Sequence, residues 1–168
     1  MINFLELFLS QSQTDNLKTV SYDKEYGGLN MKVSFGMGNP ARVSWIAFYS
    51  DEMKVSDGFY PVYLYYKAKQ TLILAYGISE TFEYARTWSQ TSIENSKIIE
   101  EFFGERVPRY GKSYVFKSYS VAFNNGMPSL HQNGEQVSMV GLTTHLDELI
   151  NTYRSELSIE AQSLDNPE

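Results

Sequence analysis

Apolar and polar residues alternate along one stretch of the chain in the way that a half-buried β-strand requires. From Leu29 to Phe35 every second residue is apolar and the residues between are polar. Residues 43–49 are apolar at nearly every position, which predicts a strand covered on both faces. Two further apolar runs predict strands over residues 59–67 and 71–77. Pro61, in the first of these, predicts a bulge or an edge position, because proline has no N–H to donate.

Three other segments carry apolar residues at helical spacing, namely residues 2–12, 98–103 and 137–157. Thr91 and Glu94 have the spacing of a capping box ahead of the second segment. The side chains that we expect on the buried sides of the three helices are Phe4, Leu5, Phe8, Leu9, Ile98, Ile99, Phe102, Phe103, Val140, Leu146, Leu149, Ile150, Tyr153 and Leu157.

The order of these elements predicts one α+β domain with a small, curved, mixed β-sheet flanked by helices. A chain of 168 residues with 42% hydrophobic residues is sufficient for one sizeable core. A loop around residues 108–111 leads into a further strand, and the stretches "NNGMPS" and "QNG" indicate loops. We place the domain at residues 1–160 and expect residues 161–168 to form a frayed tail or linker.

Composition excludes several classes of site. Without cysteine the chain has no disulfide, thiolate metal site or thiol nucleophile, and two histidines, His131 and His145, do not suggest a histidine-rich site. We therefore expect no metal and no cofactor. The apolar N-terminal segment is short, carries Glu6 and lacks a basic start, so it is typical of an amphipathic helix and not of a signal peptide or membrane span. These features predict a cytoplasmic protein without a membrane partner.

The formal net charge of −6 is spread unevenly. Residues 1–117 hold 13 basic and 13 acidic side chains, whereas residues 118–168 hold one basic and seven acidic ones. Within the neutral part, one short stretch has four cations against a single acid: Glu105, Arg106, Arg109, Lys112 and Lys117. This distribution predicts a local basic patch on an acidic protein, so a polyanionic partner is not excluded.

Two kinds of chemistry are disfavoured. Residues 36–41 satisfy the relaxed G-x-G-x-x-G/A dinucleotide pattern, but a strand follows in place of a helix, and Pro40 removes an amide that would face the phosphates. The adjacent acids at 51–52 and 100–101 are typical of solvated surfaces. We therefore expect a binding domain with no catalytic residues.

Aromatic and basic residues form a more informative pattern. Tyr60 and Leu64 share one face of the strand predicted over residues 59–67. Tyr110 lies on a loop between Arg109 and Lys112. An exposed aromatic ring flanked by cations is suited to stacking on a nucleic-acid base between phosphates. The alternative is that these tyrosines belong to the core.

Met37 stands between Gly36 and Gly38 at the tip of a predicted hairpin. A large apolar side chain at such a tip has two interpretations. It either serves as a contact that enters another molecule or folds back onto the core.

Five strings stand in order along the chain: "KVSFGMGN", "WIAF", "GFYPVYLYYK", "LILAYGIS" and "RYGKSY". Together they resemble the N-terminal recognition domains of the McrB family, the nucleotide-driven subunits of McrBC restriction systems. The resemblance covers residues 29–114. It implies sequence-tolerant binding of duplex DNA that carries a modified cytosine, 5-methylcytosine above all, by flipping the base out of the duplex. It also implies that a motor domain and a partner nuclease supply nucleotide hydrolysis and DNA cleavage.

The resemblance also implies roles for individual residues. The flipped base would lie between Tyr110 and Leu64, with Trp45 and Tyr60 also lining the pocket. Met37 would enter the space that the base leaves, although a well-known member of the family carries an aromatic residue there. The residues that we expect at the DNA backbone are Ser34, Asn39, Arg42, Lys67, Arg109 and Lys112. The alternative function is a protein-interaction module with an exposed aromatic face.

Overall fold

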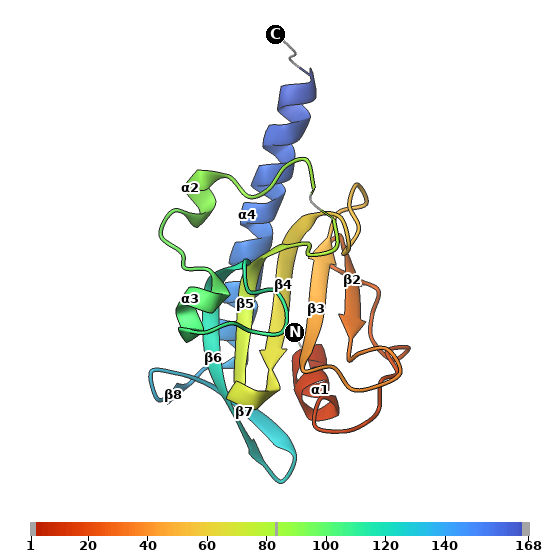
Figure 1. The fold of residues 1–168 in the computed structure, drawn as a ribbon, viewed down its shortest axis with the longest axis vertical. Coiled ribbons are helices and arrows are strands. Elements are labelled where there is room, and N and C mark those ends of the chain that lie inside the picture. The colour runs from red at the N-terminus through yellow and green to blue at the C-terminus, as the bar shows by residue number, and fades with distance from the viewer. Residues whose placement is uncertain (1–2, 83, 166–168) are drawn as a thin grey trace.

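In the residues that the structure describes, eight strands form one open sheet in which their order in space follows their order in the chain (Figure 1). The computed structural model describes residues 3–82 and 84–165. The strands are β1 (Glu25–Tyr26), β2 (Leu29–Ser34), β3 (Val43–Tyr49), β4 (Phe59–Tyr66), β5 (Thr71–Ile78), β6 (Tyr114–Asn124), β7 (Met127–Gln132) and β8 (Glu135–Gln136). Every pairing between them is antiparallel. The α+β class is confirmed, but the expectation of a mixed sheet is wrong, because each strand turns back beside the preceding one.

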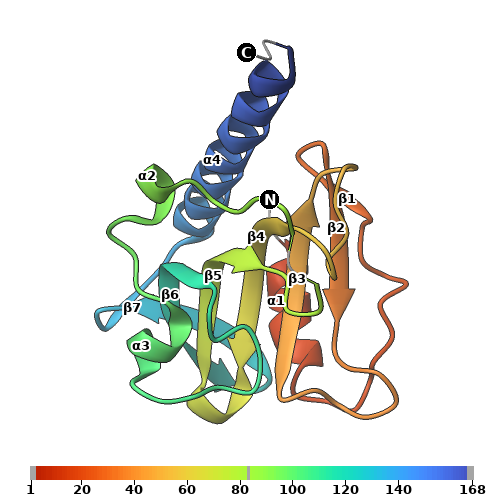
Figure 2. The same ribbon diagram turned by 45° about the horizontal axis from the view of Figure 1, so that its top comes forward.

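The helices of the described residues are α1 (Asn3–Gln11), the 3-10 turn η1 (Lys67–Lys69), α2 (Gln90–Ile93), α3 (Ile99–Phe103) and α4 (Met139–Asp165). Two views show α4 crossing behind the sheet and extending beyond its upper edge, while α3 lies in front near β6 (Figures 1 and 2). No helix in this part of the chain is long and apolar enough to cross a membrane. The helix α4 runs to Asp165. The domain boundary expected after residue 160 stays a prediction.

The back of the sheet packs on α1 and α4 through aromatic rings. Phe8 of α1 lies 5.4 Å from Phe35 between ring centroids. The ring of Phe59 on β4 meets Tyr153 of α4 edge-on at 5.6 Å and Trp88 at 5.4 Å. These residues lie on the face of the sheet opposite to Trp45, since neighbouring residues of a strand point to opposite faces.

Pro61 is neither at an edge nor in a bulge. It lies inside the central strand β4, where it pairs with Tyr76 of β5. The ladder with β3 ends at the pair Ala47–Val62 and does not include Pro61, so no hydrogen bond of that ladder lacks a donor. The irregularity in the sheet lies instead between β5 and β6, where residues 74 and 75 pair with residues 117 and 115, so that β6 carries the extra residue, Phe116.

The expected capping box is also wrong. Ser89 is the N-cap of α2, and its hydroxyl accepts a hydrogen bond from the N–H of Ser92 at 3.4 Å, whereas the N-cap of α3, Ile98, makes no side-chain cap bond. Two expected core residues are exposed, Phe102 at 41% and Val140 at 77%. The short α3 buries only one side, on which Ile99 lies.

The stretches "NNGMPS" and "QNG" contain hairpin turns, and between these turns lies a strand that we did not predict. Asn125 and Asn133 both have a positive φ, which these tight turns require. The residues between them form β7, so the interpretation of "NNGMPS" as loop alone is wrong for Met127–Ser129.

Glu156 of α4 joins this helix to the segment that precedes α2. Its side chain is buried, and its carboxylate accepts hydrogen bonds from the Ser89 N–H (2.9 Å) and from the hydroxyls of Ser89 (2.6 Å) and Ser92 (2.7 Å). Arg86 donates a further bond at 3.2 Å. Burial alone would raise the pKa of Glu156, but the bonds from the two serines and the charge of Arg86 outweigh it and lower the pKa below 4.5.

We predict that Glu156→Gln lowers the free energy of unfolding by about 2 kcal/mol at neutral pH, because bonds to a buried charge are lost. The pKa of Glu156 is lower in the folded than in the unfolded protein, so its contribution is present above pH 4.5 and is lost as the pH falls through the folded value. Urea unfolding at pH values from about 3 to about 7 measures both effects. The exposed Glu148 on the same helix supplies the control, Glu148→Gln, and an equal loss there would contradict the prediction.

Candidate functional site

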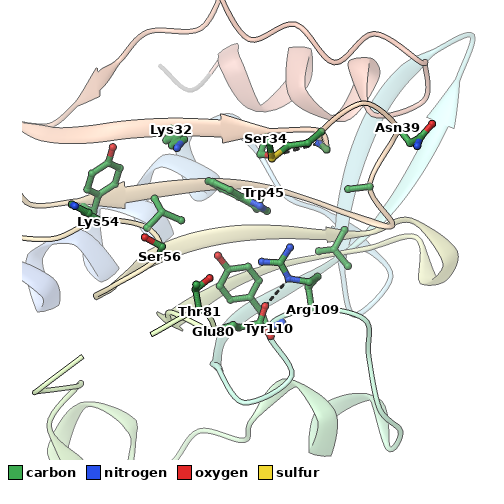
Figure 3. A pocket seen from close by; sticks show the side chains of 16 residues that line it. Lys32, Ser34, Asn39, Trp45, Lys54, Ser56, Glu80, Thr81, Arg109 and Tyr110 are labelled. Carbon is green, nitrogen blue, oxygen red and sulfur yellow. Dashed lines mark hydrogen bonds and ion pairs between the residues drawn. The ribbon is translucent and has the colours of Figure 1, made fainter. Parts of the chain in front are cut away.

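A cleft of about 690 Å³ lies on the front of the sheet, over β2 and β3 (Figure 3). Its floor consists of side chains that point forward from these strands, among them Ser34 and Trp45. Its walls come from four loops, which contain residues 36–41, 54–56, 80–81 and 109–110. The cleft is therefore built by segments that lie up to about 75 residues apart, and only the fold brings them together.

One wall is the β2–β3 hairpin tip, which holds Met37 out into solvent. The side chain of Met37 is 96% exposed, so it does not fold back onto the core. Gly36 has φ +117°, and a Cβ placed there would lie 2.2 Å from the carbonyl oxygen of Asn39. The tip is closed by a hydrogen bond from the Ala41 N–H to the Phe35 carbonyl at 2.8 Å. The backbone of the tip therefore presents an apolar side chain that is not buried in the core of the protein.

Tyr110 forms the opposite wall, but it is not the exposed ring that the loop sequence predicted. Its side chain is only 2% exposed, and its φ of +60° is rare for a residue other than glycine. The hydroxyl of Tyr60 donates to the Val55 carbonyl at 2.6 Å, so the Tyr110 hydroxyl, 3.1 Å away, donates to the Tyr60 oxygen. Burial raises the pKa of both phenols, which therefore remain neutral.

Glu80 anchors the loop that carries Tyr110. Its carboxylate accepts one hydrogen bond from Arg109 Nε at 2.6 Å and another from the Tyr110 N–H at 2.8 Å. The Tyr66 hydroxyl donates to the Arg109 carbonyl at 2.8 Å on the other side of the loop. Burial alone would lower the pKa of Arg109, but the bond and charge of Glu80 outweigh this effect and raise it. The loop is thus fixed by side chains that lie far from it in the sequence.

The remaining residues of the expected base pocket lie deeper. Trp45 is half-buried and lines the cleft, and Leu64 is its cross-strand partner on β4. Leu64 and Tyr60 have no exposed surface. The structure therefore brings Trp45 and Tyr110 to the cleft surface, with Tyr60 and Leu64 on the same face of the neighbouring strand.

The residues expected at the DNA backbone are divided between the cleft and its surroundings. Ser34, Asn39 and Arg109 line the cleft, whereas Arg42 is exposed outside its lining. Lys67 lies half-buried in η1, where burial lowers its pKa despite the charge of Asp15.

Lys112 does not line the cleft either. It forms an ion pair with Glu100 at 3.0 Å. Of the two cations expected to flank Tyr110, only Arg109 therefore faces the cleft.

Two lysines of the cleft, Lys32 and Lys54, were missed. The alternation of β2 contains a signal for Lys32, since it shares a face with Ser34. No pattern in the sequence around Lys54 predicts that it lines the cleft, because its position depends on how the β3–β4 loop folds.

The cleft offers phenols, an indole, hydroxyls, three cations and the carboxylate of Glu80, which is paired with Arg109. Aromatic rings and cations are groups that bind a flat ring beside an anion. In the part of the chain that the structure describes, no group of three or more His, Cys, Asp or Glu could hold a metal ion.

Comparison with known proteins supports a family assignment. The family described as "MrcB-like, N-terminal domain" matches residues 5–155. The chain is 35% identical over 156 residues to the "Type IV methyl-directed restriction enzyme EcoKMcrB subunit" of Escherichia coli (strain K12). The match covers 90% of this chain and 31% of that protein, so the chain spans about a third of its length.

We predict that Gly36→Ala destabilises the protein more than Gly38→Ala. A Cβ at Gly36 collides with backbone atoms, whereas nothing lies within 4 Å of one at Gly38, where only the positive φ opposes alanine. We expect losses of about 3 and about 1 kcal/mol, respectively, in the free energy of unfolding. Equal losses in chemical denaturation would contradict the described geometry of the hairpin tip.

Proposed function

The chain belongs to the family of MrcB-like N-terminal domains, and on this ground and the geometry of the cleft we propose that it binds duplex DNA carrying a modified cytosine. The observation that carries the proposal is the cleft itself, in which Trp45 and Tyr110 stand beside a hairpin tip that exposes Met37. The words "methyl-directed restriction enzyme" describe the Escherichia coli relative and make a methylated base the first candidate ligand.

The cytosine is flipped out of the duplex into the cleft. Flipping costs a few kcal/mol, and stacking on an aromatic side chain returns roughly 1–3 kcal/mol per base. Tyr110 supplies the ring, and Trp45 supplies apolar surface for the C5-methyl group of 5-methylcytosine. Leu64 has no exposed surface and supports Trp45 from the neighbouring strand. Burying one methyl group contributes about 0.8 kcal/mol, so binding is selective only if the fit also excludes other bases.

Met37 enters the duplex where the base leaves it. Methionine is one of the apolar wedges that proteins insert between base steps. Its exposure of 96% in the free protein means that burial in a duplex adds contact without removing any from the core. A methionine stacks less well than an aromatic ring, so this wedge is adaptable and not rigid.

Cations around the cleft hold the DNA backbone. Lys32, Lys54 and Arg109 line the cleft, and Arg42 and Lys112 lie outside its lining. Binding through phosphate contacts weakens steeply as salt rises, because condensed counterions are released on binding. Ser34 on the floor of the cleft and Asn39 in its hairpin wall add hydrogen-bonding groups.

The domain recognises DNA and leaves the chemistry to other parts of the system. A phenol, an indole and an alkyl group offer no activated water or nucleophile to a flipped base. Nucleotide hydrolysis and DNA cleavage belong to a motor domain and a partner nuclease. A protein-docking function is less well supported, because Tyr60 and Tyr110 are buried and do not form an exposed aromatic face.

Titration of one duplex sequence, with and without 5-methylcytosine, at fixed salt tests the proposal. We expect the modified duplex to bind at least about fourfold more tightly, which is the factor that one buried methyl group represents. Met37→Ala should weaken binding roughly fivefold, or about 1 kcal/mol, without changing thermal stability.

Met127→Ala is the matched control, since Met127 is 59% exposed and does not line the cleft. Equal affinity of the wild-type protein for both duplexes would refute the proposed function. An equal loss for the two methionine variants would refute the role of Met37.

A further inference from the structure

The stacking face of Tyr110 is already occupied in the free protein. The guanidinium carbon of Arg109 lies 5.3 Å from the centroid of the Tyr110 ring, within the range of a cation–π contact. Figure 3 shows this guanidinium beside the ring and pointing toward Trp45. A planar cation thus stands where the proposed function places a planar base.

Tyr110 is buried and is held in place by two hydrogen bonds, so its ring does not move to admit a base. Only 2% of the residue is exposed, and its hydroxyl and backbone N–H are bonded to Tyr60 and Glu80. The edge of the ring is fixed by the hydroxyl bond, whereas the guanidinium belongs to a side chain that is half exposed and able to swing away. Insertion of a base therefore requires Arg109 to move.

Glu80 opposes that movement through one of its two oxygens. Oε1 accepts the 2.6 Å bond from Arg109 Nε, and Oε2 accepts the 2.8 Å bond from the Tyr110 N–H. The first bond must break when the guanidinium leaves the ring, whereas the second holds the backbone and remains. A bond between two charged groups is about twice as strong as one between neutral groups.

We propose that Glu80 is a positioning residue that acts through Arg109: it holds the guanidinium over Tyr110 as a placeholder, which an inserted base displaces. This inference rests on the proposed function. The displaced guanidinium keeps its charge and becomes available to a DNA phosphate, so one group fills the pocket in the free protein and binds the backbone in the complex.

Glu80→Gln separates the two bonds. A glutamine oxygen still accepts from the Tyr110 N–H, whereas its NH2 group only donates and cannot accept the bond from Arg109 Nε. Glu105→Gln is the matched control, because Glu105 pairs with Lys69 and does not line the cleft, and the change removes the same charge.

The first measurement needs no DNA. Solvent exchange of the Arg109 Nε proton, followed by NMR, should accelerate on the order of tenfold in Glu80→Gln and stay unchanged in Glu105→Gln. The Tyr110 amide should remain protected in both variants. Unchanged exchange at Arg109 would overturn the inference and leave the proposed function intact.

The second measurement follows base insertion. A 2-aminopurine placed beside the 5-methylcytosine reports base flipping by its fluorescence in stopped flow. The phase that reports insertion has a rate independent of protein concentration. Changes of charge that alter the rate of encounter between protein and DNA therefore do not affect it. We expect Glu80→Gln to accelerate this phase about fivefold, because the charge-assisted bond from Arg109 is lost, and Glu105→Gln to leave it unchanged.

An unchanged or slower phase in Glu80→Gln would overturn the role of Glu80. A wild-type protein that gives no 2-aminopurine signal and binds both duplexes equally would instead refute the proposed function, and the inference with it.

Discussion

All eight residues of β4 are buried, so the sheet must be covered on both faces at its centre. Behind it, α1 and α4 supply that cover through rings such as Phe8 and Tyr153. In front, the loop that carries Arg109 and Tyr110 lies against the sheet, where it is bonded to Tyr60 and Tyr66 of β4. The cleft lies where this front cover stops, over β2 and β3. The requirement to bury β4 therefore also determines where a ligand can reach the sheet.

The chemistry of the cleft follows from this position. Tyr110 lies against the core, where burial keeps its phenol neutral and its hydroxyl is bonded to Tyr60. The hairpin tip lies away from the core, and its glycines hold Met37 in solvent. The wall at Tyr110 is thus aromatic and fixed, whereas the wall at the hairpin tip presents the exposed apolar side chain of Met37. The proposed function requires this combination, since a flipped base would stack on the fixed ring and Met37 would fill the gap that the base leaves.

Local patterns predicted the strands well and the site only in part. The alternation of residues 29–35 and the apolar run at 43–49 located β2 and β3, because burial of a strand depends on its own side chains. The burial of Tyr110 could not be predicted, because its partners Glu80 and Tyr60 stand 30 and 50 residues earlier. Pro61 was misplaced for the same reason, since the end of the β3 ladder depends on another strand. The resemblance of five strings to a family, and not their spacing, assigned roles to Leu64 and Met37.

The proposed function requires that a modified cytosine leaves its duplex and lies on Tyr110. A crystal structure of the domain with a hemimethylated duplex tests this requirement. We expect the methylated base inside the cleft, stacked on Tyr110 with its C5-methyl group toward Trp45, and Met37 in the gap between the flanking base pairs. A methylated cytosine that remains paired within the duplex, with the cleft empty and Met37 still in solvent, would refute the proposed function.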